Sequence, residues 1–189
     1  MDTTPSGTYI FTQEQHQQLI PWIAALHASC ITQDHMVGPF LPPLTNEKLL
    51  PWWRERIAEV NAGTRVIVLL LAQTTPAKKA EGRDFRGLAM FKTSDVETGT
   101  FRGHIDAVLV NQKYRRQGGA RALVRALEYE AARKGRTLLL VDTETGSVAE
   151  AAFKSFGYVE VGKIPAYSHV LPNGKRGGTF FYKDLVASS

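Results

Sequence analysis

The stretch YRRQGGARAL, residues 114–123, places three arginines around two adjacent glycines where a helix is expected to begin. A hydrophobic run at 100–110 precedes it, and the apolar spacing predicts a helix over 120–134 that Gly135 ends. A helix N-terminus already carries partial positive charge, so cations there are unfavourable unless an anion binds. The glycines lack a Cβ and let backbone N–H groups converge on one small volume. The stretch therefore predicts a phosphate-binding loop between a strand and a helix.

Two common phosphate-binding loops are absent from the chain. A Walker A loop requires G-x-x-x-x-G-K-[ST], and the dinucleotide-binding turn requires G-x-G-x-x-G; the sequence contains neither. A solvated basic loop without a ligand therefore stays open as the alternative on composition alone.

The composition is that of one globular domain with a basic balance. The chain has 189 residues, of which 43% are hydrophobic and 22% charged. A formal net charge of +5 and a pI of about 9.4 favour an anionic partner, either nucleic acid or a phosphorylated cofactor. No run of five basic residues occurs, which argues against nucleic acid.

Signals for membrane insertion, secretion and metal binding are missing. No segment has 18 consecutive apolar residues, and the start MDTTPSGT lacks a basic stretch leading into an apolar one. We therefore expect a soluble cytoplasmic protein without membrane contact. The single cysteine, Cys30, has no companion for a disulfide or a metal site, and a small buried residue is favoured over a catalytic thiol.

The order of expected elements indicates a single α/β domain with a mixed sheet over residues 9–186, after a disordered N-terminus at 1–8. Pro21 predicts a break in the first helical segment near 18–20. Three consecutive strands precede the helix at 120–134, which excludes a doubly wound dinucleotide fold. Strands are expected at 9–11, 64–73, 86–94, 100–110, 136–142, 158–164 and 178–185, helices at 12–32, 45–61, 120–134 and 148–156, and long loops at 34–44 and 165–178.

Two motifs resemble a known enzyme family. Arg115-x-x-Gly118-x-Ala120 matches the [Q/R]-x-x-G-x-[G/A] motif of the GNAT N-acetyltransferases, within a run at 108–135 that looks like a strand, pyrophosphate loop and helix of that family. The run DTETGSVAEAAFKSFGYVEVGKIPAY at 142–167 is similar to its acceptor-side helix and strands, most closely those of the tabtoxin-resistance type. The order of elements agrees over about 8–186, whereas the first 60 residues carry no motif.

The resemblance implies a mostly antiparallel mixed sheet, flanked by helices and splayed between its fourth and fifth strands. Acetyl-CoA would lie in that gap, with its pyrophosphate on the glycine loop and its pantetheine along the strand at 100–110. The acceptor amine would attack directly, without a covalent acyl-enzyme. The cofactor-binding residues implied are Val108, Leu109, Val110, Arg115, Arg116, Gln117, Gly118, Gly119, Ala120, Arg121, Ser147 and Phe153.

Deprotonation of the acceptor amine requires a base near the gap. His104 and Asp106 share one face of their strand, and a period of two puts Val108 on the same face. His104 ordinarily titrates near neutrality and suits a base. Asp142, at the end of the next strand, would lie across the gap and could bind or deprotonate the amine. A surface histidine and a strand-end turn aspartate remain the alternatives.

The general acid is where the chain departs from the family. Many members have a Tyr in the pattern Y-x-x-x-G-[FY], and its hydroxyl protonates the departing thiolate; here Phe153 stands in that position. Phenylalanine has no proton to give, so we assign no general acid. A thiol with a pKa of about 8.5 is a fair leaving group, which reduces the need for one.

Aromatic residues mark the expected acceptor side. Phe40, Trp52 and Tyr167 fall in the segments that would frame it, and they predict a pocket for a small molecule. The resemblance to the tabtoxin-resistance type implies that this molecule is a small amine such as an amino acid, toxin or antibiotic, with a role in detoxification or resistance. Two alternatives stay open: a peptide or protein N-acetyltransferase, and a non-catalytic acyl-CoA-binding module, which Phe153 favours. A homodimer is compatible with the resemblance, but the sequence does not define the oligomeric state.

Overall fold

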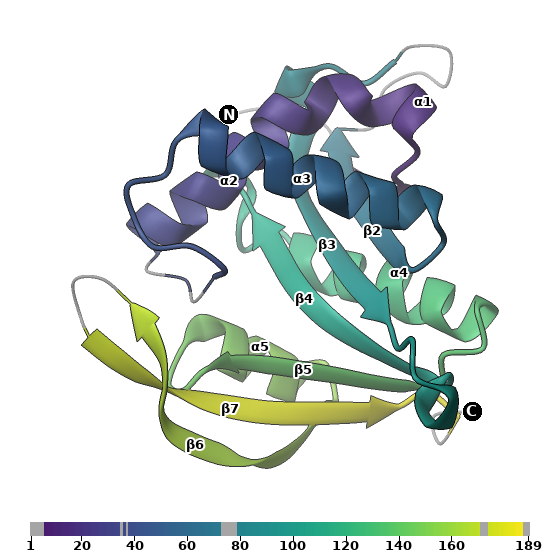
Figure 1. Cartoon of the computed structure of the whole chain (residues 1–189), viewed down its shortest axis with the longest axis vertical. Helices are drawn as coiled ribbons and strands as arrows, with labels where there is room; N and C mark the ends of the chain where they lie inside the picture. Colours follow the sequence, from purple (N-terminus) through teal and green to yellow (C-terminus); the bar gives the residue numbers. More distant parts are fainter. Residues whose placement is uncertain (1–5, 35, 37, 73–78, 171–173, 187–189) are drawn as a thin grey trace.

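A seven-stranded sheet forms the centre of the molecule in the computed structural model, which describes residues 6–34, 36, 38–72, 79–170 and 174–186 (Figure 1). The strands lie in the order β1-β2-β3-β4-β5-β7-β6. All neighbouring pairs are antiparallel except β4 and β5, which are parallel. The strand bounds are β1 Ser6–Ile10, β2 Arg65–Ala72, β3 Phe85–Thr93, β4 Arg102–Val110, β5 Leu138–Glu144, β6 Val159–Val170 and β7 Gly174–Asp184.

Helices cover both faces of this sheet. α1, α2 and α3 lie on one face, and α4 and α5 lie on the other (Figure 1). The predicted break is confirmed, because a 3₁₀ turn at Gln17–Leu19 separates α1 from α2 and Pro21 takes an early position in α2, where its missing N–H costs little. The helix bounds are α1 Gln13–His16, α2 Ile20–Gln33, α3 Asn46–Asn61, α4 Gly119–Arg133 and α5 Val148–Ser155.

Each face of the sheet has its own hydrophobic core. Trp53 of α3 packs with Leu69 of β2 in the first core, and Leu127 of α4 packs with Val68 of β2 in the second. β2 is buried along its whole length, as its continuous apolar sequence predicts for a strand covered on both faces.

The sheet splits between β4 and β5. Only four residue pairs join these strands, from Arg102↔Leu138 to Ile105↔Val141. Beyond Ile105 the two strands diverge into a V that opens away from the paired end (Figure 1). The predicted fold class, a single domain with a mixed, mostly antiparallel sheet splayed between the fourth and fifth strands, is confirmed.

The predicted loop at 165–178 is wrong, because most of it belongs to a long hairpin. β6 continues to Val170 and β7 begins at Gly174, while residues 171–173 lie outside the described part. Pro165, which suggested a loop, is tolerated because β6 is the edge strand of the sheet and one side of it needs no hydrogen-bond partner. A register shift between Ile164 and Ser168, with Ala166 at φ 54°, absorbs the irregularity.

The N-terminal boundary also moves. β1 begins at Ser6 and pairs with β2 through Ser6↔Ala72, so residues 6–8 of the predicted disordered segment form part of the sheet, and residues 1–5 lie outside the described part.

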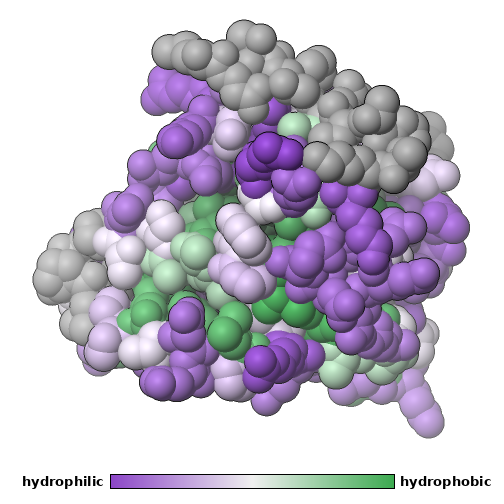
Figure 2. All heavy atoms as spheres, turned by 90° about the horizontal axis from the view of Figure 1, so that it is seen from above, coloured by the Kyte–Doolittle hydropathy of each residue, from purple (hydrophilic) through white to green (hydrophobic). Residues whose placement is uncertain are grey.

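Seen from above, hydrophobic residues reach the surface with hydrophilic ones between them (Figure 2). Within the described ranges, no helix is long and apolar enough to span a membrane, and no group of three His, Cys, Asp or Glu side chains could hold a metal.

Candidate active site

A histidine joins the two diverging strands at the apex of the V. His104 lies on β4 next to the last pair of the parallel ladder, and its Nε2 is 3.1 Å from Oδ1 of Asp142, the first β5 residue beyond that ladder. Its Nδ1 is 3.0 Å from Oδ1 of Asp106. The three residues predicted as catalytic therefore come together, with carboxylates on both nitrogens of one imidazole.

A β-bulge sets which way these side chains face. The register between β3 and β4 shifts from Met90↔Ala107 to Phe91↔Ile105, so Asp106 is an extra residue without a partner on β3. The predicted shared face for His104, Asp106 and Val108 is therefore wrong in part. His104 and Asp106 face the side of α2 and α3, whereas Val108 packs against the core under α4.

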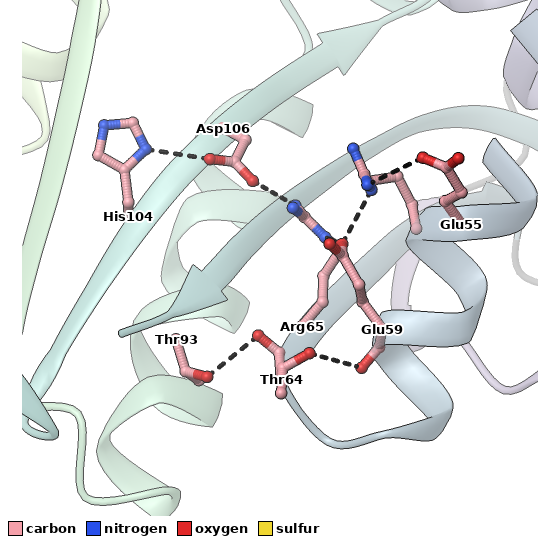
Figure 3. Close-up of polar contacts among 8 residues, drawn as sticks. Glu55, Glu59, Thr64, Arg65, Thr93, His104 and Asp106 are labelled. Carbon is pink, nitrogen blue, oxygen red and sulfur yellow. Dashed lines mark hydrogen bonds and ion pairs between the residues drawn. The ribbon is translucent and has the colours of Figure 1, made fainter. Parts of the chain in front are cut away.

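A buried arginine anchors this group, and sequence reasoning missed its role. Arg65 of β2, with a side chain only 4% exposed, bonds to Asp106 through its Nη1 and to Glu59 of α3 through its Nε. Arg56 pairs in turn with Glu59 at 2.8 Å. Figure 3 shows Arg65 between the two carboxylates, with His104 beyond Asp106. The one sequence signal was a charged residue opening an otherwise apolar strand.

The two carboxylates determine the charge of the imidazole. Hydrogen bonds to Asp106 and Asp142 raise the pKa of His104 to about 9, against the opposing effect of burial. Burial would raise the pKa of Asp106, but the bond to His104 and the charge of Arg65 outweigh it and lower that pKa. The sequence suggested that His104 titrates near neutrality. The raised pKa means that it is instead an imidazolium at pH 7.

We predict that the His104 imidazole titrates near pH 9 in the folded protein. Because the folded pKa is raised above the ordinary 6.5, the stabilisation from this group is full below pH 6.5 and is lost as pH rises through about 9. NMR titration of the imidazole measures the midpoint, and urea unfolding of wild type and His104→Gln at pH 6 and pH 9.5 measures the stability. A midpoint near 6.5, or a stability difference that does not shrink with pH, would contradict the assignment.

The glycine loop presents a row of free backbone donors. The N–H of Arg115 bonds to Gln112 and that of Ala122 bonds to Gly118, but the six N–H groups from Arg116 to Arg121 find no acceptor among the residues that the structure describes. Arg116 at φ 58° and Gly118 at φ 81° supply the left-handed turns that bend the loop into the first turn of α4. A Cβ on Gly118 would have no atom of the described residues within 4 Å, so there is open space beside this glycine.

Two arginines of the loop already have partners. Arg115, predicted to hold phosphate, donates to both carboxylate oxygens of Asp34 at the end of α2 and to the carbonyl of Val110 at 2.8 Å. It therefore ties the loop to α2. Arg121 lies 3.3 Å from the Ser155 hydroxyl of α5 and 4.8 Å from the Phe156 ring. These contacts lie at the surface and link α4 to α5.

Two further residues that were predicted to contact the cofactor also make contacts within the protein. Ser147 caps α5, since its hydroxyl accepts from the N–H of Glu150 at 3.1 Å. Phe153 is 4% exposed and packs its ring 5.0 Å from Tyr158 and 6.5 Å from Phe181 in the core between α5 and the sheet. The Phe153 ring is therefore part of the second hydrophobic core.

The predicted acceptor residues fall into two groups. Phe40 and Trp52 make an edge contact, with ring centroids 5.7 Å apart, above the first core. Tyr167 lies on β6 and packs against Phe180 of β7 at 4.9 Å. Phe180 pairs directly with Asp142 across the sheet, so Tyr167 and Phe180 form an aromatic wall beside the Asp142 carboxylate. Sequence reasoning missed Phe180, which reads as an ordinary strand residue.

Comparisons with known proteins agree with this fold. yncA from Salmonella typhimurium, solved with its cofactor acetyl-CoA, is 16% identical with a TM-score of 0.70, over 96% of this chain and 94% of that one. A candidate phosphinothricin N-acetyltransferase is 15% identical with a TM-score of 0.73, over 96% and 99% of the chains. Ribosomal-protein-alanine N-acetyltransferase from Brucella melitensis is 19% identical with a TM-score of 0.69, over 95% and 99%. The model of the acetyltransferase (GNAT) family matches residues 47–158, more than half of the chain, and the protein therefore belongs to that family.

Proposed function

We propose that this acetyltransferase moves an acetyl group from acetyl-CoA to the amine of a small molecule by direct attack of the amine. Family membership supplies the reaction class and the cofactor. One observation supports the binding of the cofactor and the acceptor amine in this chain. The free N–H groups of Arg116–Arg121 and the carboxylate of Asp142 lie at the same split in the sheet.

The described residues fit acetyl-CoA. When bound, this cofactor supplies an acetyl thioester, which an amine can attack. The N–H groups from Arg116 to Arg121 suit the pyrophosphate, and Gly118 leaves space for it. Arg116 has no hydrogen bond or ion pair within the described residues, so its guanidinium can pair with a phosphate oxygen. Gln117, Gly119 and Ala120 contribute backbone donors.

β4 offers a second binding element. Beyond Ile105 its edge toward β5 has no strand partner, so backbone groups of the Val108–Val110 segment can pair with the amides of the pantetheine. The carbonyl of Val110 is already bonded to Arg115. We therefore assign pantetheine binding to the unpaired edge of Val108 and Leu109, nearer the apex.

Asp142 is the residue best suited to the acceptor amine. Its side chain is 27% exposed and lies beside the wall of Tyr167 and Phe180, so a cationic or neutral amine can reach it. Once the new N–C bond forms, the attacking nitrogen becomes strongly acidic, and a carboxylate can take its proton. His104 is charged at neutral pH and is not that base.

The aromatic wall supports a small acceptor. Tyr167 and Phe180 form a T-shaped aromatic pair next to a carboxylate, an arrangement suited to an amine with a short carbon skeleton. The likeness to the phosphinothricin N-acetyltransferase fold agrees with this class. We extend the proposal to an acceptor of the tabtoxin-like or amino-acid-like kind, and with it to detoxification in the cytoplasm. The likeness to the ribosomal-protein-alanine enzyme favours a second candidate, a protein N-terminus.

One assay separates these candidates. The protein is incubated with acetyl-CoA and either amino-acid-like amines or peptides that begin with alanine, and free thiol release is followed. We expect turnover with the small amines. Turnover confined to peptides would support the second candidate. Tight CoA binding without any turnover would support a non-catalytic acyl-CoA-binding module.

Arg116→Ala is expected to raise the KM for acetyl-CoA by about tenfold, the effect of losing one charge-assisted hydrogen bond. The kcat should change little, because Arg116 lies far along the strand from the apex. Arg133→Ala, which removes an exposed arginine at the opposite end of α4, is the matched control. Equal KM values for the two variants would refute the assignment of Arg116 to the cofactor.

A further inference from the structure

We infer that His104 is the proton donor to the departing CoA thiolate, in place of the tyrosine that this chain lacks. The inference rests on the proposed function and adds a second role at its site. It starts from the observation that the imidazole stands at the apex of the split, where the unpaired edge of β4 begins, with a carboxylate on each nitrogen.

The usual donor position cannot serve here. Phe153 carries no proton and lies in the core under α5. The neighbouring hydroxyl of Tyr158 is buried in the same core, and burial raises its pKa far above its ordinary value. Both residues lie on the face of α4 and α5, whereas His104 faces the opposite side, with Asp142 and the aromatic wall. Among these groups, only the imidazole has a proton to give at the apex.

The charges around His104 keep it protonated. Asp106 from its own strand and Asp142 from β5 favour the imidazolium. Lys92 of β3 lies directly across from His104 in the ladder, and Arg65 of β2 lies beyond Asp106; both cations oppose it. The carboxylates outweigh the cations, and the resulting pKa of about 9 is close to the thiol value of about 8.5. Proton transfer between groups of matched pKa is efficient in either direction.

The proton balance closes within the cluster. The acceptor enters as the neutral amine, having lost its first proton to solvent. Its nitrogen forms a bond to the acetyl carbon, the C–S bond breaks, and the electron pair goes to sulfur, which takes the Nε2 proton of His104. The proton on the new amide nitrogen passes to Asp142, and Asp142 returns it to His104 across their 3.1 Å contact. The products are the amide and the free thiol, and both residues regain their starting charge.

The two sides of the imidazole have different freedom. Asp106 is fixed by Arg65, which is itself held by Glu59, so the Nδ1 side is anchored. Asp142 has one partner among the described residues, and its contact with Nε2 is partly exposed, with 44% of the His104 side chain accessible. An amine that engages Asp142 therefore releases Nε2–H toward the gap, while Nδ1 stays in place.

The test compares two acetyl donors that differ in the acidity of their thiol. His104→Gln keeps a polar side chain whose amide N–H can donate to a carboxylate, but it has no ionisable proton to transfer. With acetyl-CoA, its kcat should fall about tenfold to a hundredfold, at the low end of general acid effects because the thiolate leaves readily. With 4-nitrothiophenyl acetate, whose thiolate needs no proton, wild type and variant should react at nearly equal rates.

A pH profile gives the second readout. The acceptor is an amino acid amide, whose amine has a pKa of about 7.7. The wild-type kcat should fall above pH 9, and this fall should be absent in His104→Gln. Asp142→Asn, which removes the base and one carboxylate beside His104, should lose activity with both donors. An equal loss with both donors for His104→Gln, or donor dependence in Tyr167→Phe instead, would overturn the inference. No turnover by wild type with any amine would overturn the proposed function instead.

Discussion

Replacing Asp142 by asparagine is expected to lower kcat for the amine by about 10²- to 10⁴-fold, the usual range for losing a positioned general base. The asparagine side chain would keep the shape and one hydrogen-bond acceptor, but it could not take the proton of the attacking nitrogen. The amide would also remove one of the two carboxylates that hold His104 charged. The KM for acetyl-CoA should stay near its wild-type value, because the phosphate loop lies at the other end of the split.

Steady-state kinetics with saturating acetyl-CoA measures this effect, and Asp95→Asn is its control. Asp95 is an exposed aspartate between β3 and β4, away from the imidazole. An unchanged kcat in Asp142→Asn would show that the amine loses its proton to another group or to water. A loss of similar size in Asp95→Asn would point to a general effect on the fold.

Arg65→Met is expected to lower the free energy of unfolding by about 3 kcal/mol, the lower end of the cost of breaking a buried ion pair. The methionine fills much of the same volume but leaves Asp106 and Glu59 facing each other without a cation between them. The lower end applies because those carboxylates remain 28% and 24% exposed. Activity should fall as well, since Asp106 would no longer be anchored beneath His104.

The effect of Arg65→Met should depend on pH in a defined direction. Asp106 has a lowered pKa in the folded protein, so its stabilisation is present above its ordinary pKa and is lost as pH falls through the folded value. Urea unfolding should therefore show a smaller difference from wild type at pH 3.5 than at pH 7. Arg83→Met, at an exposed arginine paired with Glu81, should stay within about 0.5 kcal/mol of wild type. A loss below about 1 kcal/mol in Arg65→Met would mean that solvent replaces the buried pair.

The parts of the site that rest on local sequence were predictable. The glycine loop and the start of α4 follow from neighbouring residues, because backbone freedom at Gly118 and helix periodicity are properties of a short segment. The splayed sheet followed from the resemblance of two motifs. Asp142 opens the second motif, whereas His104 lies outside both motifs and was predicted from the strand at 100–110; the structure brings the two side chains to 3.1 Å from each other.

What escaped prediction depends on contacts between distant segments. Arg115 reads as a phosphate ligand until the fold brings Asp34 beside it, 81 residues away in the chain. Arg65 is 41 residues from Asp106, and nothing near either residue reveals the pair. Part of the hairpin of β6 and β7 was predicted as a loop because proline and glycine are typical of loops. They are also tolerated in a strand at the edge of a sheet, and β6 is such a strand.

The extra residue at Asp106 shifts the alternation of side chains along β4 by one position. Before it, even-numbered positions such as His104 face the side of α2 and α3; after it, even-numbered positions such as Val108 face the side of α4. Deleting Asp106 would remove the bulge and restore regular alternation, so Ile105, Ala107 and Val108 would keep their present faces while the carboxylate beside Nδ1 of His104 would be lost. The residues at the apex and the residues that pack beneath α4 lie on opposite faces of the same nine-residue strand, β4. A substitution on one face can therefore change the chemistry without changing the packing, and the reverse also holds.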